Sequence, residues 1–173
     1  MEPKPWQHNG WVEQSQNILD SYERLLGENL VDRNGSSNAQ AERLFHAPFV
    51  VVSHGTEADP LLNYANEVAL RLWKISIATL LVTPSRMTAE PVHRDERARL
   101  LERTTRDGFV DDYRGIRIAT DGQRFLIDRA TVWNLKDASG NSVGQAATFD
   151  RWTNLQDGEN PFENKLPEQE ELF

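Results

Sequence analysis

The clearest change of hydrophobic pattern in the chain lies in residues 48–73. β-Branched and aromatic residues run from 49 to 52, which predicts a buried strand, and residues 61–64 are long enough for a second, antiparallel strand. The spacing of apolar residues then changes from two to 3.6. This change predicts a helix that carries Val68, Ala69, Leu72 and Trp73 on one face, with Asn63 or Asn66 as its N-cap.

A second helix is predicted ahead of these strands, over residues 11–26, where Gly27 supplies a left-handed stop. Its apolar positions form one stripe: Trp11, Ser15, Ile18, Leu19, Tyr22, Leu25 and Leu26. The stripe must be buried either on the chain's own sheet or on a partner, so a homodimer through this helix is one of two alternatives. A polar linker, 28–40, and a short helical turn, 39–45, lead to the first strand.

The segment after Trp73 predicts one more helical turn over 74–81 and then a helix from a Thr88 cap to Asp107, with Gly108 at its end. One face of that helix carries two ionisable residues ahead of a leucine pair: His93, Arg97, Leu100, Leu101 and Thr104. An inward guanidinium must meet a ligand anion or a buried acid, for which Asp112 and Asp128 are the candidates, or extend to solvent.

The remainder of the chain predicts three strands, over 113–119, 124–135 and 143–152. The Asp121-Gly122 pair predicts a hairpin between the first two, and alternation places one set of residues on a single face of the long strand: Phe125, Ile127, Thr131, Trp133 and Leu135. Two strands, then helices, then three strands is an α+β order.

Length and charge favour one domain with additions. We expect an N-terminal helix and linker at 1–46, a core at 47–152, and an acidic, flexible tail at 153–173, which holds six acidic residues and one lysine. The arginines between 94 and 106 alternate with acids, so no nucleic-acid partner is expected. No apolar run approaches the roughly 20 residues of a membrane helix, so the expected location is cytoplasmic, without a membrane partner.

The sequence contains no cysteine, which excludes cysteinyl-flavin adducts, thioester-linked chromophores and iron–sulfur clusters. Haem with His93 as its axial ligand is a weaker alternative. His54, Glu57 and Asp59 are metal-ligand types, but polar residues in a turn serve as backbone caps, and we predict no metal site. Ser53 and His54 point to opposite faces of a strand, so we predict no catalytic residues.

Eight short motifs resemble the MEKHLA domain in their order and spacing: SHGTEADPLLNYAN, ALRLW, PSR, ERARLL, DYRGIRI, DGQRF, ATVWNL and GQAATFDRW. The resemblance covers roughly residues 11–152. It implies a PAS-like fold, with a five-stranded antiparallel sheet of order 2-1-5-4-3, helices on one face and an N-terminal flanking helix. MEKHLA domains occur as stand-alone bacterial proteins and at the C-terminus of plant class III homeodomain–leucine zipper factors, where they regulate dimerisation.

A sensory, ligand-binding or regulatory interaction module without its own output domain is therefore expected, acting on an unknown protein partner. The alternatives are a structural dimerisation module without ligand and an uncharacterised small-molecule enzyme. We expect that the chain is not an enzyme. No cofactor is identified, and a small polar or anionic ligand is the expected occupant of the core. Its candidate binding residues are Asn63, Tyr64, Trp73, His93, Arg97, Arg117, Trp133 and Gln145.

Overall fold

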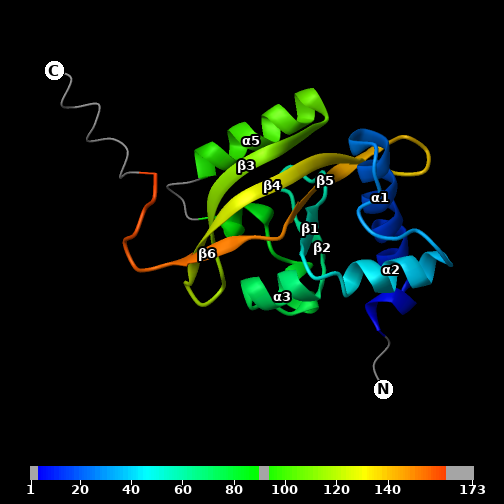
Figure 1. Ribbon diagram of the computed structural model, residues 1–173, viewed down its shortest axis with the longest axis horizontal. Coiled ribbons are helices and arrows are strands. Elements are labelled where there is room, and N and C mark those ends of the chain that lie inside the picture. The colour runs from blue at the N-terminus through cyan, green and yellow to red at the C-terminus, as the bar shows by residue number, and fades with distance from the viewer. Residues whose placement is uncertain (1–3, 90–93, 163–173) are drawn as a thin grey trace.

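One antiparallel sheet organises the structure, a computed structural model that describes residues 4–89 and 94–162, with only the backbone of residues 94, 96 and 97 (Figure 1). Its strands are β1 (Val50–His54), β2 (Leu62–Ala65), β3 (Phe109–Ile118), β4 (Arg124–Lys136), β5 (Ser142–Phe149) and β6 (Trp152–Leu155). The order β2-β1-β5-β4-β3 is the predicted one, and β6 adds a pairing to β4 beyond the end of β5.

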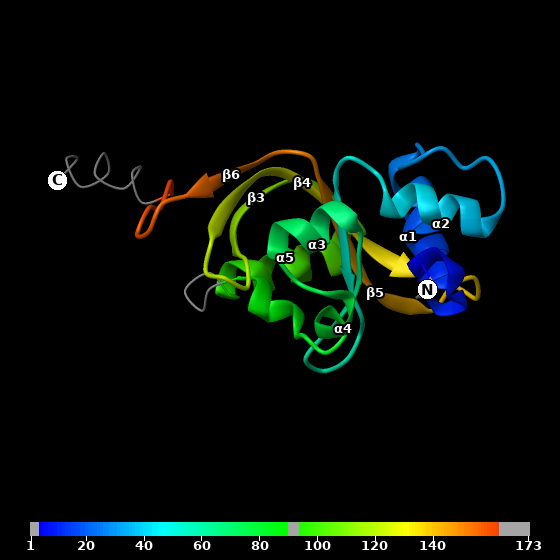
Figure 2. The same cartoon turned by 90° about the horizontal axis from the view of Figure 1, so that it is seen from below.

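One side of the sheet, the inner face, is covered by α3 (Glu67–Trp73), α4 (Ile77–Leu80), η2 (Ser85–Thr88) and α5 (Arg94–Asp107) (Figure 2). Asn66, rather than Asn63, is the N-cap of α3, since its side-chain oxygen accepts from the Ala69 amide at 3.2 Å. The predicted start of the long helix at Thr88 is wrong. Thr88 instead ends η2, where its hydroxyl donates to the Ser85 carbonyl, and α5 begins at Arg94.

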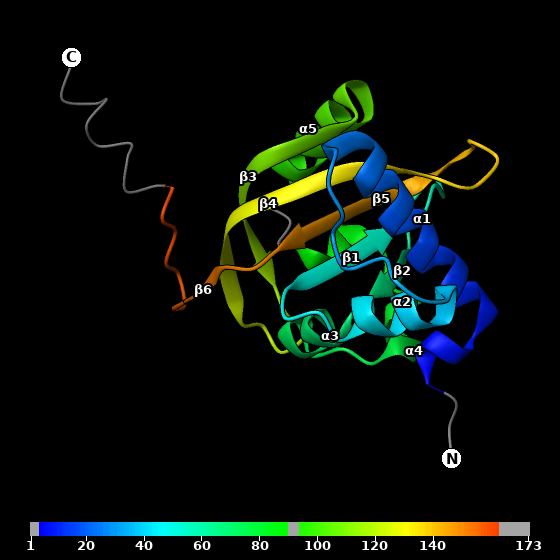
Figure 3. The same ribbon diagram turned by 45° about the vertical axis from the view of Figure 1, so that its right-hand side comes forward.

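The opposite side, the outer face, is covered by the N-terminal segment: η1 (Pro5–Gln7), α1 (Asn9–Leu26) and α2 (Ser37–Phe45) (Figure 3). The apolar stripe of α1 is buried against Tyr64, Trp133 and Leu135 of its own sheet. Gly27 ends the helix at φ 76°, as predicted. Because the chain buries this stripe itself, the stripe no longer argues for a homodimer through α1.

The long strand β4 does not keep one face throughout, so the predicted alternation from Phe125 to Leu135 is wrong. Phe125 and Ile127 lie on the inner face, whereas Trp133 and Leu135 lie on the outer face. The pairing steps two residues along β3, from Tyr113 to Gly115, but three along β4, which marks a bulge on β4. One extra residue reverses the alternation, and every later side chain changes face.

The segment after Trp152 is more ordered than predicted over its first residues, because 153–155 pair with β4 as part of β6. Leu155 and Phe162 then pack with Ile116 and Leu126 in a small apolar cluster. Residues 156–162 form no helix or strand, and the rest of the predicted tail, 163–173, lies outside the described residues. None of the helices in the described ranges is long and apolar enough to cross a membrane.

Candidate ligand-binding site

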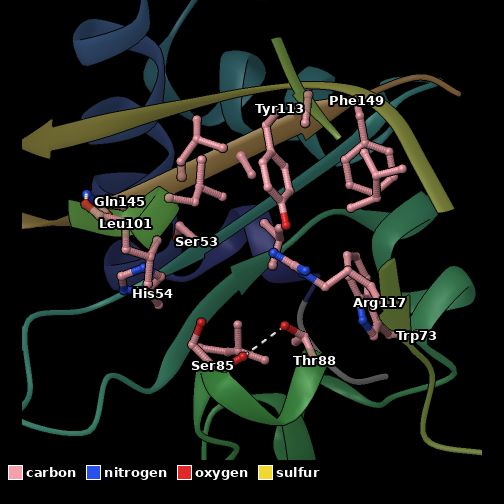
Figure 4. A pocket seen from close by; sticks show the side chains of 18 residues that line it. Ser53, His54, Trp73, Ser85, Thr88, Leu101, Tyr113, Arg117, Gln145 and Phe149 are labelled. Carbon is pink, nitrogen blue, oxygen red and sulfur yellow. Dashed lines mark hydrogen bonds between the residues drawn. The ribbon is translucent and has the colours of Figure 1, made fainter. Parts of the chain in front are cut away.

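A cavity of about 70 Å³ lies between the inner face of the sheet and the helices α5 and η2 (Figure 4). Its walls are largely apolar: Val52, Leu62, Trp73, Leu100, Ile127 and Phe149. Small side chains help to leave this space unfilled. The central strands place Ala130 and Ala147 at the cavity. The site is therefore a hollow in an apolar core.

Arg117 is the only cation among the described residues that line this cavity. It is 7 % exposed, and in Figure 4 its guanidinium points toward the middle of the pocket, between Tyr113 and Thr88. One nitrogen donates to the carbonyl of its neighbour Ile116 at 2.9 Å. None of the described carboxylates forms an ion pair with it. A buried cation without a counter-charge is unfavourable, so an anion or a polar ligand would be favourable beside this group.

The strand β3 positions this cation through a three-residue pattern on its inner face: Tyr113, Gly115 and Arg117. The guanidinium carbon of Arg117 lies 5.2 Å from the centre of the Tyr113 ring, within range of a cation–π interaction. A side chain at position 115 would overlap the Tyr113 hydroxyl, so only glycine allows the phenol ring to lie along its own strand. The ring and the glycine together hold the guanidinium at the cavity.

Hydrogen-bond donors other than Arg117 also line the cavity. Ser85 and Thr88 contribute hydroxyl groups from η2. The indole of Trp73, a residue 7 % exposed, packs edge-on against Phe125, with ring centres 5.3 Å apart. Its buried Nε1–H finds no acceptor within the described chain. The guanidinium of Arg117 and the indole N–H of Trp73 are donors that suit a ligand with acceptor oxygens, whereas the Thr88 hydroxyl already donates to the Ser85 carbonyl.

Gln145 ties the wall of the cavity to the last turns of α5. Its side-chain nitrogen lies 3.2 Å from the Leu101 carbonyl, 3.1 Å from the Thr105 hydroxyl and 2.9 Å from the side-chain oxygen of Asn134. Asn134 in turn donates to the Thr104 carbonyl at 2.8 Å. These two side-chain amides therefore bind the last turns of α5 to β4 and β5.

Three of the eight predicted binding residues meet at the cavity: Trp73, Arg117 and Gln145. Two others, Tyr64 and Trp133, belong to the outer core and contact α1, where Trp11 and Tyr22 stack on them with ring centres 4.7 and 5.0 Å apart. The bulge in β4 is the reason why Trp133 lies on the outer face instead of at the cavity.

Asn63 also lies on the outer side, as an extra residue in β2 opposite Ser53 and His54 of β1. Its side-chain oxygen accepts from the Ser53 hydroxyl at 2.6 Å.

His93, and with it the haem alternative, lies outside the described residues, as does the side chain of Arg97. The acids considered for Arg97 are both largely exposed, and pair at 3.7 Å (Asp112 with Arg103) and 3.9 Å (Asp128 with Arg114).

The cavity-lining residues with polar groups that sequence reasoning missed include Tyr113, Ser85 and Thr88. A signal for Tyr113 was present, because Tyr113, Gly115 and Arg117 alternate on one strand and so share a face. The hydroxyls of η2 carried no such signal. A helix was expected from Thr88 onward, and only the tertiary structure brings the preceding turn to the sheet.

The residues considered for metal binding or catalysis have other partners. Glu57 accepts from the Leu61 amide at 3.2 Å, Asp59 pairs with Arg86 at 3.2 Å, and Nδ1 of His54 lies 2.9 Å from the Gly55 carbonyl. Within the described ranges no cluster of three or more histidines and acids could hold a metal ion.

A flavin or porphyrin does not fit the space around Arg117. A cavity of roughly 150 Å³ accommodates benzene, whereas this one measures about 70 Å³. The absence of cysteine from the sequence also excludes a flavin–thiol adduct. The residues present therefore suit a head group of a few atoms, and we derive no chemistry through either chromophore.

Comparison with solved structures shows the fold. The PAS domain of a protein from Colwellia psychrerythraea has a TM-score of 0.56 at 12 % identity, over 68 % of this chain and 94 % of that one. A light-oxygen-voltage domain in a study of a flavin analogue has a TM-score of 0.53 at 16 % identity, over 78 % and 95 %. The fungal blue-light photoreceptor Vivid, as a light-state dimer, has a TM-score of 0.51 at 14 % identity, over 76 % and 90 %.

Comparison with curated proteins gives no match. The sequence itself matches the MEKHLA domain over residues 12–154, which includes most of α1 on the outer face, the inner cavity and most of β6. The resemblance seen in the sequence is confirmed: this chain belongs to the MEKHLA domain family and has the α+β fold of PAS domains.

Proposed function

We propose that this chain is a PAS-type sensory module that binds a small carboxylate in its inner cavity and signals to a partner protein. The observation that carries the proposal is Arg117, a cation in an apolar cavity, 7 % exposed and without an ion-pair partner in the described chain. A bound carboxylate would supply the missing counter-charge. It would also offer an oxygen to the indole N–H of Trp73.

The chemistry of the site favours a monoanion. A guanidinium presents parallel N–H groups that match the two oxygens of a carboxylate. A dianion such as a phosphate monoester would bring a second negative charge into the same apolar space, and no second cation from the described residues lines it. Because an uncompensated buried charge is strongly unfavourable, a carboxylate suits the site better than a phosphate.

A route for the signal starts at the cavity wall. Gln145 lines the cavity and holds the carbonyl of Leu101 in α5. A ligand that displaces the Gln145 side chain would loosen α5 from the sheet, so occupancy would alter the surface that α5 presents to a partner. We assign no reaction to the site, since the Ser53 hydroxyl donates to the side-chain oxygen of Asn63 rather than to His54.

Thermal unfolding with a panel of small carboxylates and phosphates tests the proposal. A carboxylate at about 100 times its Kd should stabilise the wild type by roughly 2.7 kcal/mol. Arg117→Met keeps an unbranched apolar side chain and removes the cation, so its stabilisation should disappear. Arg114→Met is the matched control, because Arg114 lies on the same strand with its side chain 40 % exposed beside Asp128 and Phe162. The proposal fails if no oxyanion stabilises the wild type, or if Arg117→Met responds as the wild type does.

A further inference from the structure

A second cavity adjoins the first and is much larger. Its volume is about 530 Å³, and it lies between α3, α4, η2 and the turn that joins β3 to β4. Val52, Leu62, Trp73 and Thr88 line both cavities. The two spaces are therefore neighbours that share a wall, and Trp73 stands where they meet.

The second cavity, which we call the apolar cleft, has a uniform lining. Its deep wall is made of small buried residues, including Ala65 and Ala69. None of the described residues that line it is charged. Four threonines contribute uncharged hydroxyl groups, and the rest of the walls offer hydrocarbon contact.

The apolar cleft reaches the surface at two exposed apolar residues. Val82 is 72 % exposed and Met87 48 % exposed, and both belong to its lining. Only three large hydrophobic residues are this exposed in the described chain, so two of the three gather at one opening. Exposed apolar surface beside a groove is typical of a binding site.

The sizes of the two cavities then divide the ligand into two parts. The space at Arg117 holds a head group of a few atoms. The volume of the apolar cleft falls within the range of roughly 300–1,000 Å³ that is common for small-molecule sites. A ligand that ended at the head group would leave the cleft without an occupant, whereas one with a hydrocarbon tail would fill both.

We infer that the ligand is a monocarboxylate with an apolar tail, such as a medium-chain fatty acid. The carboxylate binds Arg117, and the tail passes Trp73 into the apolar cleft toward Val82 and Met87. The inference rests on the proposed function, because the head group uses the same cation. It adds the class of ligand and the path of its tail.

Calorimetric titration of the full chain with acetate, butyrate, hexanoate and octanoate tests this inference. Each methylene that enters the cleft should tighten binding roughly fourfold, and octanoate should bind at least about a hundredfold more tightly than acetate. Arg117→Met should weaken octanoate more than tenfold, and octanol should bind the wild type more weakly than octanoate by a similar factor.

A pair of tryptophan substitutions locates the tail. Ile75 lines the apolar cleft and does not line the cavity at Arg117, so Ile75→Trp should fill the cleft and weaken octanoate at least tenfold. Leu81 is 44 % exposed and lines neither space, so Leu81→Trp should bind octanoate as the wild type does. Circular dichroism of each variant checks its folding. If Ile75→Trp does not fold, the chain-length series of the wild type decides by itself.

The remaining outcomes separate the two proposals. If acetate binds through Arg117 but longer chains bind no more tightly, the tail inference is overturned and the proposed function stands. If octanol binds as tightly as octanoate, the cleft takes a tail but the carboxylate site is wrong. If no chain length binds, both proposals fail.

Discussion

The two faces of the sheet are built from the same strands and packed in opposite ways. On the outer face, large side chains fill the interface with α1 and α2, and Trp133, Tyr64 and Leu135 are all completely buried. On the inner face, Ala130 and Ala147 line a cavity within the core and a second cavity adjoins it, whereas the hollows on the outer side, of about 360 and 720 Å³, lie beside α1 rather than at this aromatic centre. The outer face therefore supplies stability, and the inner face gives up packing for space.

The difference extends to polar groups. The outer core contains polar atoms in tight aromatic packing, such as the buried hydroxyl of Tyr64, and carries no charge. The inner face buries the guanidinium of Arg117 beside a hollow. A charge beside empty space can be compensated by a molecule from outside, whereas one inside a filled core cannot. This contrast is why we place ligand binding on the inner face.

Two tryptophans allow a direct test of the contrast. Trp133 is completely buried in the filled outer core, and Trp73 is 7 % exposed beside the two cavities. Trp133→Ala should lower the free energy of unfolding by about 5 kcal/mol, and Trp73→Ala by about 3 kcal/mol, because Trp73 already lacks neighbours on one side. Urea unfolding of both variants measures the difference. Equal losses would mean that the inner face is packed as tightly as the outer one.

A smaller effect is expected from the glycine that makes room for Tyr113. Gly115→Ala places a methyl group against the phenol and should lower the free energy of unfolding by roughly 1–3 kcal/mol. In a Tyr113→Leu background the same methyl group should have little effect, which a double-mutant cycle reports. An unchanged loss in both backgrounds would show that the glycine is needed for its backbone rather than for the ring.

The buried cation gives an effect of the opposite sign. Without ligand, Arg117→Met should raise the free energy of unfolding by about 1–2 kcal/mol, because an apolar side chain replaces a buried charge that has no ion-pair partner among the described residues. The same substitution at the exposed Arg114 should change it by no more than about 0.5–1 kcal/mol. A marked loss of stability in the Arg117 variant would indicate that the protein already satisfies this guanidinium by itself.

The smallest change in the free energy of unfolding at neutral pH is expected for the Tyr64 hydroxyl in the outer core. Burial raises the pKa of Tyr64 far above its ordinary value of 10. The unfolded chain therefore releases the Tyr64 proton above pH 10 while the folded chain keeps it. Stability from this group is complete below pH 10 and falls by roughly 1.4 kcal/mol for each further pH unit.

Unfolding of the Tyr64→Phe variant tests this pH dependence. Its alkaline slope should be shallower than that of the wild type, while the two proteins should differ little at pH 7. Parallel slopes above pH 10 would mean that the Tyr64 hydroxyl titrates normally in the folded state.

Much of this architecture could be predicted from local pattern. The helical stripe of α1, its stop at Gly27 and the Asp121-Gly122 hairpin all depend on residues close in sequence, whose spacing matches the period of each element. The order of the strands was implied by the resemblance to the MEKHLA domain. The motifs also identified the family. The site was predicted only in part, since Trp73, Arg117 and Gln145 meet at the cavity while Asn63, Tyr64 and Trp133 lie on the outer side.

The sequence by itself determined the elements, their order and the residues able to carry charge into the core, because these depend on composition and on spacing along the chain. The tertiary structure decided which face each residue joins. One extra residue in β4 moves Trp133 outward, and one in β2 puts Asn63 beside Ser53. A bulge has no hydrophobic period of its own, and a cavity is a property of several strands and helices together. Only the packed structure therefore shows that Arg117 faces a hollow and that the stripe of α1 is buried on its own sheet.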